Sequence, residues 1–243
     1  MSNRARLIGV GVGPGDPGLL TLHAVRALEN ADVIAHFAKA GNPSNARAVV
    51  EQYLPAGSLE LPLRYPITTE RSTADPVYRS AIQKFFDEAA SEIATHLESG
   101  RTVAVLSEGD PLFFGSYMHL HVRLMKHYPT EVIPGITSMS GCWSAAGLPL
   151  AQGDDVLVVL PATLDEQELN RRFTQNDPAV VMKVGRHLAK VRRALEATGR
   201  LPGAVYVERG TMNEQALMSL ADKADDTAPY FAIVLVPGRA WAP

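Results

Sequence analysis

The sequence of 243 residues has little cysteine, no long apolar run and no large excess of charge of either sign. Its single cysteine, Cys142, excludes an internal disulfide and a zinc site built from several cysteines, so we expect a buried structural thiol. The formal net charge is only −3, which gives no electrostatic footprint for nucleic-acid binding. No stretch reaches the ~18 apolar residues that a membrane-spanning helix needs.

The first residues also lack the features of a targeting segment. Residues 1–6 are too short, and too soon followed by glycines, to be a signal peptide. We therefore expect a cytoplasmic protein with neither a nucleic-acid nor a membrane partner. The length is sufficient for two modest domains, each with a core of its own.

What the sequence does contain is an alternation of short β-branched runs with segments of helical periodicity. In the first half this alternation predicts a parallel α/β layer, with a long helix that Asp75 caps, Pro76 opens and Gly100 ends. Its apolar stripe is predicted at Ile82, Phe86, Ala89, Ile93 and Leu97, and that of the first helix at Leu22, Val25 and Leu28. Strands are expected at 6–12, 33–37, 102–106, 131–135, 155–162, 179–185, 204–210 and 230–238, with helices in the second half near 165–175, 187–198 and 213–223.

The small residues and prolines of PGITSMSGCWSAAGLPL interrupt the apolar runs near the middle of the chain. We place a domain boundary there. The fold expected is α/β, with two α/β domains, residues 1–136 and 137–243, and a ligand cleft between them.

The glycines of the segment GVGPGDPG stand at the G-x-G-x-x-G spacing of the dinucleotide fingerprint. That fingerprint works when backbone N–H groups and a helix N-terminus face a pyrophosphate. Here Pro14 and Pro17 have no N–H, and Asp16 puts a carboxylate where the phosphates would lie. The segment therefore does not predict a nucleotide-phosphate site, although its glycines indicate that something approaches the backbone closely.

Three glycine-punctuated turns, GVGPGD, SEGDP and IPGITS, follow predicted strands. Ligands in open α/β sheets bind beyond the carboxyl ends of strands, so these turns would form a site if they converge. The segments GVGPGDPGLLTLHAVRALENADVI, SEGDPLFFGS, VIPGITSMSGC and VERGTMNEQ together resemble the tetrapyrrole methylases, which are class III S-adenosylmethionine-dependent methyltransferases. Within that family, HFAKAGNPSNARAVVEQYLP, LRYPIT and GDPLFFGSYMHL are most similar to the branch of precorrin-2 C20-methyltransferases.

The resemblance implies the tetrapyrrole methylase fold, a homodimer, S-adenosylmethionine as the methyl donor and no metal cofactor. It also implies transfer of a methyl group to the C20 meso carbon of precorrin-2, giving precorrin-3A, in the synthesis of the corrin ring. Three alternatives stay open. The acceptor could be cobalt-factor II, the enzyme could act on another tetrapyrrole, RNA or protein, or the chain could be a non-enzymatic small-ligand sensor.

The resemblance further implies donor-binding residues, many of them acting through their backbone. Such contacts are expected from Pro14, Glu108, Gly109, Asp110, Phe113, Thr137, Ser138, Val184, Gly210 and Ala232. The donor is a sulfonium cation without phosphates, so it tolerates a loop with few N–H groups and a carboxylate. Glu108 stands where the family often has glycine, and its role is left open. The carboxylate of Asp110 has an alternative interpretation, as the cap of the helix that follows.

The acceptor implied by the resemblance is a reduced tetrapyrrole with eight carboxylates, which would require cations around it. Arg64, Lys183 and Arg186 are candidates because each adjoins a strand end or a turn. Tyr117, after the second of the three turns, is a candidate for stacking on the macrocycle or for a hydrogen bond to it. The basic run at 190–193 is interpreted instead as a solvated helix face.

Methylation of the meso carbon displaces a proton, and a base is needed to remove it. Related uroporphyrinogen methylases place an aspartate just after the second strand, where this sequence has Phe37. His36, beside it, titrates in a suitable range and is the candidate catalytic base. Alternation along VIAHF gives an equally weighted alternative, in which His36 is a core histidine.

Overall fold

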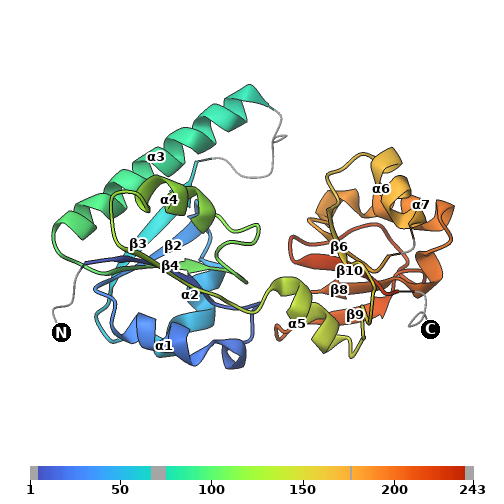
Figure 1. Ribbon diagram of the computed structural model, residues 1–243, viewed down its shortest axis with the longest axis horizontal. Helices are drawn as coiled ribbons and strands as arrows, with labels where there is room; N and C mark the ends of the chain where they lie inside the picture. Colours follow the sequence, from blue (N-terminus) through green and yellow to red (C-terminus); the bar gives the residue numbers. More distant parts are fainter. Residues whose placement is uncertain (1–4, 67–74, 176, 239–243) are drawn as a thin grey trace. The chain divides into compact units, whose positions relative to one another are not determined.

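The computed structural model describes residues 5–66, 75–175 and 177–238 (Figure 1). The chain divides into two compact units, Met1–Thr137 and Ser138–Pro243, one residue away from the expected boundary. Each unit contains a five-stranded sheet with helices, so the expected α/β class is confirmed. Within the ranges described, no helix combines the length and the apolar character needed to cross a membrane.

The first unit is built around a parallel sheet with the strand order β3-β2-β4-β1-β5. Its strands are β1 (Leu7–Gly11), β2 (Val33–Lys39), β3 (Leu59–Tyr65), β4 (Val103–Ser107) and β5 (Thr130–Ile133). β1 and β4 lie side by side in the middle, and every residue of both is buried. Strands covered on both faces read as continuous apolar runs, which explains why β1 and β4 were recognisable in the sequence.

Helices cover both faces of this sheet (Figure 1). The helices α1 (Leu22–Glu29) and α2 (Asn45–Val50) pack on one face, with the short 3₁₀ helices η1 (Pro17–Leu19) and η2 (Glu51–Tyr53) next to them in the chain. The opposite face is covered by α3 (Pro76–Glu98) and α4 (Tyr117–Leu124). Each face therefore has its own hydrophobic core.

The long helix α3 follows its sequence signals closely. The carboxylate of Asp75 accepts a hydrogen bond from the N–H of Val77, Pro76 is the first helical residue, and Gly100 takes the positive φ of 83° that ends the helix. In α1 the expected stripe is partly wrong, because Leu22 is 75% exposed. The buried residues of α1 are Ala24, Ala27 and Leu28, and the small side chains of the two alanines let the helix approach the sheet closely.

The second unit has a mixed sheet with the order β6-β7-β10-β8-β9. β6 and β7 are parallel, whereas β10 is antiparallel to both β7 and β8. The strands are β6 (Val158–Pro161), β7 (Ala179–Met182), β8 (Val205–Glu208), β9 (Ala216–Ser219) and β10 (Ala232–Val236), and the helices are α5 (Ser138–Ala145), η3 (Gly185–His187), η4 (Leu201–Gly203), α6 (Glu166–Thr174) and α7 (Leu188–Ala197).

Cys142 of α5 packs in the smaller core of this unit, with Val207 and Leu235 of the sheet. It is a free, buried cysteine, as expected, and burial raises the pKa of its thiol to about 12. The thiol is therefore a packing group and a poor nucleophile at neutral pH.

The helix expected near 213–223 is wrong. Residues Ala216–Ser219 form the strand β9, in which Ala216 pairs with Glu208 and Ser219 pairs with Val205 of β8. Alanine, leucine and methionine favour helices intrinsically, but pairing with a neighbouring strand overrides that preference.

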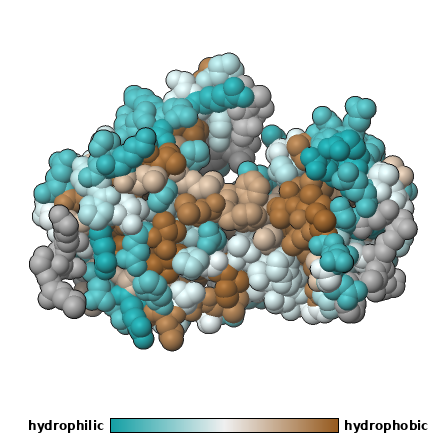
Figure 2. Space-filling view, viewed as in Figure 1, coloured by the Kyte–Doolittle hydropathy of each residue, from teal (hydrophilic) through white to brown (hydrophobic). Residues whose placement is uncertain are grey.

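Hydrophobic residues appear at several places on the surface between hydrophilic ones (Figure 2). Among the most exposed are Leu22, Tyr230 and Val156, at 75%, 73% and 62%. Most of the surface of any folded protein is apolar, so exposure alone does not locate a binding site. The site has to be found from the topology.

Candidate functional site

After the carboxyl ends of the neighbouring strands β1 and β4, the chain turns toward opposite faces of the sheet. The chain leaves β1 through α1 on one face of the sheet and leaves β4 through α4 on the other face (Figure 1). This divergence is a topological switch point, the place where open α/β sheets bind their ligands. The turns after β1 and β4 are the first two of the three predicted turns.

The structure brings these two turns into direct backbone contact. Gly13 and Gly109 exchange hydrogen bonds, with N···O distances of 3.3 Å from Gly13 to Gly109 and 2.8 Å in the reverse direction. The N–H of Val12 also donates to the carbonyl of Ser107 at 2.9 Å. The positive φ angles of Gly13 and Gly109, 77° and 65°, favour glycine at both positions.

The third turn, after β5, packs against the other two. A Cβ atom added to Gly135 would lie 2.1 Å from the carbonyl oxygen of Gly109 and 2.9 Å from the backbone of Gly11. The N–H of Gly135 donates to Oδ2 of Asp110 at 3.1 Å. The three predicted turns thus meet at the carboxyl end of the first sheet, as a site built from them requires.

The loop after β1 satisfies its own polar groups. Oδ1 of Asp16 accepts the N–H of Gly18 at 2.7 Å, and Oγ1 of Thr21 caps α1 by accepting from Ala24. Pro14 is buried and Pro17 opens η1, so neither offers an N–H. Two of the donors that would cradle a pyrophosphate are thus absent, and the N–H of Gly18 is occupied, which agrees with the sequence interpretation.

Asp110 fastens two turns together. Its Oδ1 accepts the N–H of Leu112 at 2.9 Å, and its Oδ2 accepts the N–H of Gly135. The next helix, α4, begins only at Tyr117, and its cap residue is Ser116. The alternative interpretation of Asp110 as a helix cap is therefore wrong, because its carboxylate closes a turn and holds the loop after β5.

Glu108, the residue between Ser107 and Gly109, has a different environment. Asn45, the first residue of α2, makes a side-chain hydrogen bond to it. Desolvation by the surrounding protein raises the pKa of Glu108, and the Asn45 hydrogen bond opposes that change in part. The side chain nevertheless keeps solvent-exposed surface. Its carboxyl group is therefore crowded without being sealed off.

Sequence reasoning missed Asn45. It lies 63 positions before Glu108 in the sequence and belongs to a separate helix, so no local spacing connects the two residues. The only local signal is Ser44, whose hydroxyl accepts the N–H of Arg47 and caps α2, fixing where that helix begins.

The remaining predicted donor contacts after β4 and β5 are Phe113, Thr137 and Ser138. All three are half-buried. Phe113 lies in the loop after β4, and its ring packs edge-on against Phe114, which has a positive φ of 54°. Thr137 follows β5, and Ser138 opens α5.

In the second unit, Val184, Gly210 and Ala232 lie at the same end of three neighbouring strands. Val184 follows β7, Gly210 follows β8, and Ala232 begins the antiparallel strand β10. At this end the N–H of Arg209 donates to the carbonyl of Phe231 at 2.8 Å. Val184 and Ala232 are 0% and 3% exposed, counting backbone and side chain together. In this structure neither residue therefore presents more than a trace of surface that a ligand could reach.

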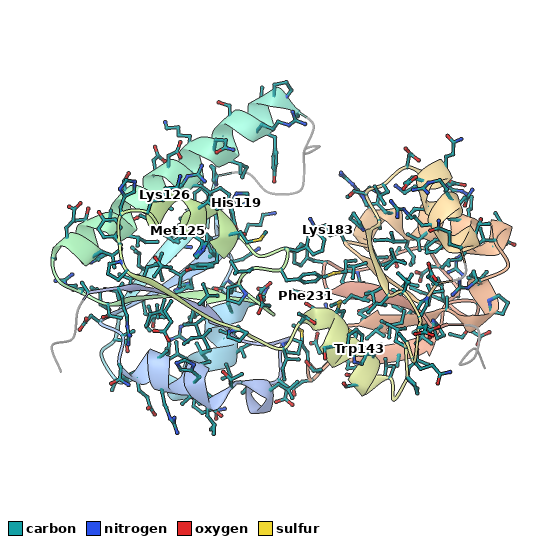
Figure 3. The ribbon with its side chains drawn as sticks, viewed as in Figure 1. His119, Met125, Lys126, Trp143, Lys183 and Phe231 are labelled. Atoms are coloured by element: carbon teal, nitrogen blue, oxygen red, sulfur yellow. The ribbon has the colours of Figure 1, made fainter. Side chains whose placement is uncertain are left out.

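Three residues with a strained backbone lie at the same end of the sheet. Lys183, Arg209 and Thr211 have positive φ angles of 58°, 47° and 69°. Non-glycine residues in this region cost roughly 1–3 kcal/mol each and cluster at functional sites. Lys183 and Phe231 are labelled in Figure 3. Because such strain is common at functional sites, it supports this end of the second sheet as the functional one.

The predicted cations Arg64, Lys183 and Arg186 all have exposed side chains. The basic run at 190–193 is tied to its own unit, since Lys190 donates to the carbonyl of Leu164 and Arg193 pairs with Glu166. The predicted solvated helix face is therefore only partly correct, because Lys190 is half-buried whereas Arg193 is exposed.

Tyr117, predicted to stack on the macrocycle or to hydrogen-bond to it, lies in the core of the first unit. It is fully buried, its hydroxyl lies 3.2 Å from Nδ1 of His121, and its ring fills the space above Gly9, where a Cβ would come within 2.4 Å. The structure gives it the packing role of a core residue of the first unit.

His36 is also buried, with 7% of its surface exposed. Its Nε2 lies 3.4 Å from Oε2 of Glu60, which also accepts from Arg47 at 3.0 Å. Within the described ranges no hydrogen-bond partner meets its buried Nδ1. Burial lowers the pKa of His36, and Glu60 opposes this only in part. This placement corresponds to the alternative of a core histidine.

Phe37, the residue after His36, belongs to an aromatic cluster. Its ring stacks on Tyr65 with centroids 5.7 Å apart and also approaches Phe85 and Phe86 of α3. His119 of α4 stacks on Phe86 at 4.3 Å. In the ranges that the structure describes, no three histidine, cysteine or acidic side chains form a metal-binding group.

Comparison with protein families matches residues 6–224 to the model of Tetrapyrrole (Corrin/Porphyrin) Methylases. A precorrin-2 C(20)-methyltransferase of Sinorhizobium sp is 65% identical over 233 residues, which cover 96% of this chain and 95% of that protein. A cobalt-precorrin-2 C(20)-methyltransferase of Salmonella typhimurium is 28% identical, with 97% of each chain covered.

Among solved structures, a uroporphyrin-III C-methyl transferase from Thermus thermophilus, complexed with S-adenyl homocysteine, has the same fold. Its TM-score is 0.67 at 24% identity, and the match covers 97% of this chain and 98% of that chain. This chain therefore has the fold of that solved structure.

Proposed function

The chain belongs to the tetrapyrrole (corrin/porphyrin) methylase family, and from this premise we propose that it transfers a methyl group from S-adenosylmethionine to C20 of precorrin-2. The product is precorrin-3A, an intermediate of cobalamin biosynthesis. The observation that carries the proposal is the 65% identity over 96% of the chain to a relative of that named activity.

The donor site proposed in the first unit comprises Pro14, Glu108, Gly109, Asp110, Phe113 and Thr137. Three turns converge there at a switch point, with few free N–H groups and two acidic residues after β4. Such a surface suits a sulfonium cation better than a pyrophosphate. Ser138, Val184, Gly210 and Ala232 of the second unit are proposed as further donor contacts, the last three chiefly through their backbone.

The reaction needs little covalent chemistry from the protein. The electron-rich meso carbon attacks the methyl carbon, the carbon–sulfur bond breaks, and its electron pair stays on sulfur. Holding the two reactants in line supplies ~7–11 kcal/mol of the barrier reduction in well-oriented reactions. Positioning by rigid turns is therefore the main catalytic device that we propose.

The carboxylates of the acceptor need cationic partners, and Arg64, Lys183 and Arg186 remain our candidates. All three are exposed, and Lys183 is held in a strained conformation directly after β7. Tyr117 stays a sequence prediction for substrate contact, although its burial favours an indirect role through the packing of α4 on β1.

We further propose a cytoplasmic homodimer that uses no metal cofactor and binds neither nucleic acid nor membrane. The near-neutral charge and the family resemblance support this description. Light scattering on the purified protein tests the dimer, and metal analysis of the active protein tests the cofactor.

The decisive experiment incubates the protein with methyl-labelled S-adenosylmethionine and with each acceptor separately. We expect label to enter precorrin-2 at C20 faster than it enters cobalt-factor II, since the cobalt-named relative is only 28% identical. Donor binding without methylation of either acceptor would leave a sensor as the better description. Preferential methylation of cobalt-factor II would assign the chain to the cobalt-dependent route.

A further inference from the structure

The proton displaced from C20 needs a base close to the bound methyl donor. The meso carbon must approach the methyl group to about 3–3.5 Å before it reacts. A carboxylate on or beside the turns that hold the donor would therefore be within reach of C20. The described turns after β1, β4 and β5 carry three acidic residues, Asp16, Glu108 and Asp110.

Two of these carboxylates are already engaged by the backbone. Asp16 accepts the N–H of Gly18, and Asp110 accepts one N–H with each of its oxygens. Glu108 differs, because the partner identified for it is the side chain of Asn45 and its surface is exposed. Uptake of a proton by Glu108 would therefore disturb no backbone contact that the structure describes.

We propose that Glu108 accepts the proton displaced from C20 and that Asn45 is the positioning residue for its carboxyl group. This inference rests on the proposed function. After the carbon–carbon bond has formed, the C20–H bond breaks, its electron pair restores the conjugated bridge, and the proton passes to the Glu108 carboxylate. S-adenosylmethionine and the tetrapyrrole thus give S-adenosylhomocysteine, which is a thioether, the methylated tetrapyrrole and one proton. No other reactant is needed.

The surroundings of Glu108 suit this task. Desolvation raises its pKa, which makes the carboxylate a stronger base than an ordinary glutamate, while Asn45 keeps part of the charged form stabilised. On the flanking β2, β3 and α2, Arg47 and His36 both face Glu60.

His36 is less suited to the same role. Its ring is buried, its Nε2 faces Glu60, and burial lowers its pKa, which weakens it as a base. The geometry therefore favours Glu108 over the histidine that the sequence suggests.

The first test compares Glu108→Gln with His36→Gln and with Glu51→Gln, which removes an exposed carboxylate on η2 that pairs with Arg47. We expect Glu108→Gln to lower turnover at saturating donor ~10²–10⁴-fold, the range for a lost general base, and to lower donor affinity by calorimetry, to which its charge also contributes, much less. It should also introduce a primary isotope effect with C20-deuterated acceptor. His36→Gln and Glu51→Gln should keep most of the turnover.

The second test uses the pH profile. The wild-type rate should fall on the acid side as Glu108 becomes protonated. Asn45→Ala removes the hydrogen bond that lowers the pKa of Glu108, so this acid limb should move to higher pH. A merely structural role of Asn45 would lower activity without moving the limb.

The outcomes separate the two proposals. If wild type methylates no tetrapyrrole, the proposed function itself fails. If wild type is active and Glu108→Gln matches it, or if His36→Gln alone removes the acid limb, the function stands and Glu108 is not the proton acceptor.

Discussion

At the scale of single residues, Asp110 connects the site to the stability of the first unit. Both of its carboxylate oxygens accept backbone N–H groups, one from its own turn and one from the turn after β5. An aspartate in this position serves the fold whether or not it also touches the donor.

Replacing Asp110 by asparagine should therefore affect both properties. Asparagine offers one acceptor oxygen, so either Leu112 or Gly135 loses its partner, which costs ~1–3 kcal/mol when the group is shielded from water. We expect the free energy of unfolding in urea to fall by about 1 kcal/mol or slightly more, and the affinity for S-adenosylmethionine to fall with it.

Asp16→Asn is the matched control. Asp16 accepts a single N–H, and asparagine caps such turns as well as aspartate does, so unfolding and donor binding should stay near wild type. Unchanged unfolding in Asp110→Asn would contradict the structural role, and unchanged donor affinity would remove Asp110 from the donor site.

At the scale of elements, β1, β4 and β5 are joined by glycines that leave no room for side chains. Gly11, Gly109 and Gly135 touch backbone to backbone at the carboxyl end of the sheet. These contacts determine how closely the three turns approach one another, and so determine the shape of the proposed donor site.

Gly135→Ala tests this close approach. The added methyl group would lie 2.1 Å from the carbonyl oxygen of Gly109, against rigid backbone on two sides. We expect a loss of more than ~3 kcal/mol or no soluble folded protein. In Gly57→Ala nothing lies within 4 Å, and only the positive φ of 80° is strained, so about 1–2 kcal/mol should be lost. Equal melting temperatures for the two variants would contradict the packing described.

The loop after β1 gives a prediction of ligand choice. The prolines lack N–H groups, and Asp16 occupies the N–H of Gly18. Nicotinamide and flavin dinucleotides should therefore show no measurable binding in calorimetric titration, while S-adenosylmethionine and S-adenosylhomocysteine bind. Micromolar affinity for NAD together with none for the methyl donor would contradict both the loop geometry and the proposed function.

The elements also show what a sequence can predict. α3 carries its start, stripe and stop locally, in Asp75, Pro76 and Gly100, and it is confirmed in full. The meeting of three turns followed from a general rule of parallel sheets. β9 was missed because its strand form depends on β8. The pairs Asn45–Glu108 and His36–Glu60 join separate elements, so only the folded chain shows them.

At the scale of the whole molecule, each unit has its own sheet and its own buried clusters. Unfolding can therefore proceed in two transitions, and probes placed in each unit would follow them separately. The histidines with lowered pKa values are divided between the units, with His36 and His119 in the first and His187 in the second.

Acidification should destabilise the protein before its carboxylates titrate. Burial lowers the pKa of these three histidines below the ordinary value of 6.5, so the unfolded chain binds protons first as the pH falls. Their stabilising contribution is complete above pH 6.5 and is lost as the pH falls toward their folded-state pKa values. Urea midpoints should thus be lower at mildly acidic than at mildly alkaline pH.

His36→Gln should reduce that difference for the first unit, because His36 is the most buried of the three. A midpoint that is equal or higher at mildly acidic pH would contradict the lowered pKa values.

The central place of β1 in its sheet has a consequence for how the chain is made. β1 is synthesised before both of its neighbours, because Leu7 pairs with Val103 and Thr130, far along the chain. At ~5–20 residues per second, the ribosome takes roughly 5–20 s to reach Val103 after Leu7. Throughout that time the apolar strand LIGVG has neither of its neighbours. β1 thus has to wait for β4 and β5 before it can pair, and until then it is a natural binding segment for chaperones that capture nascent chains.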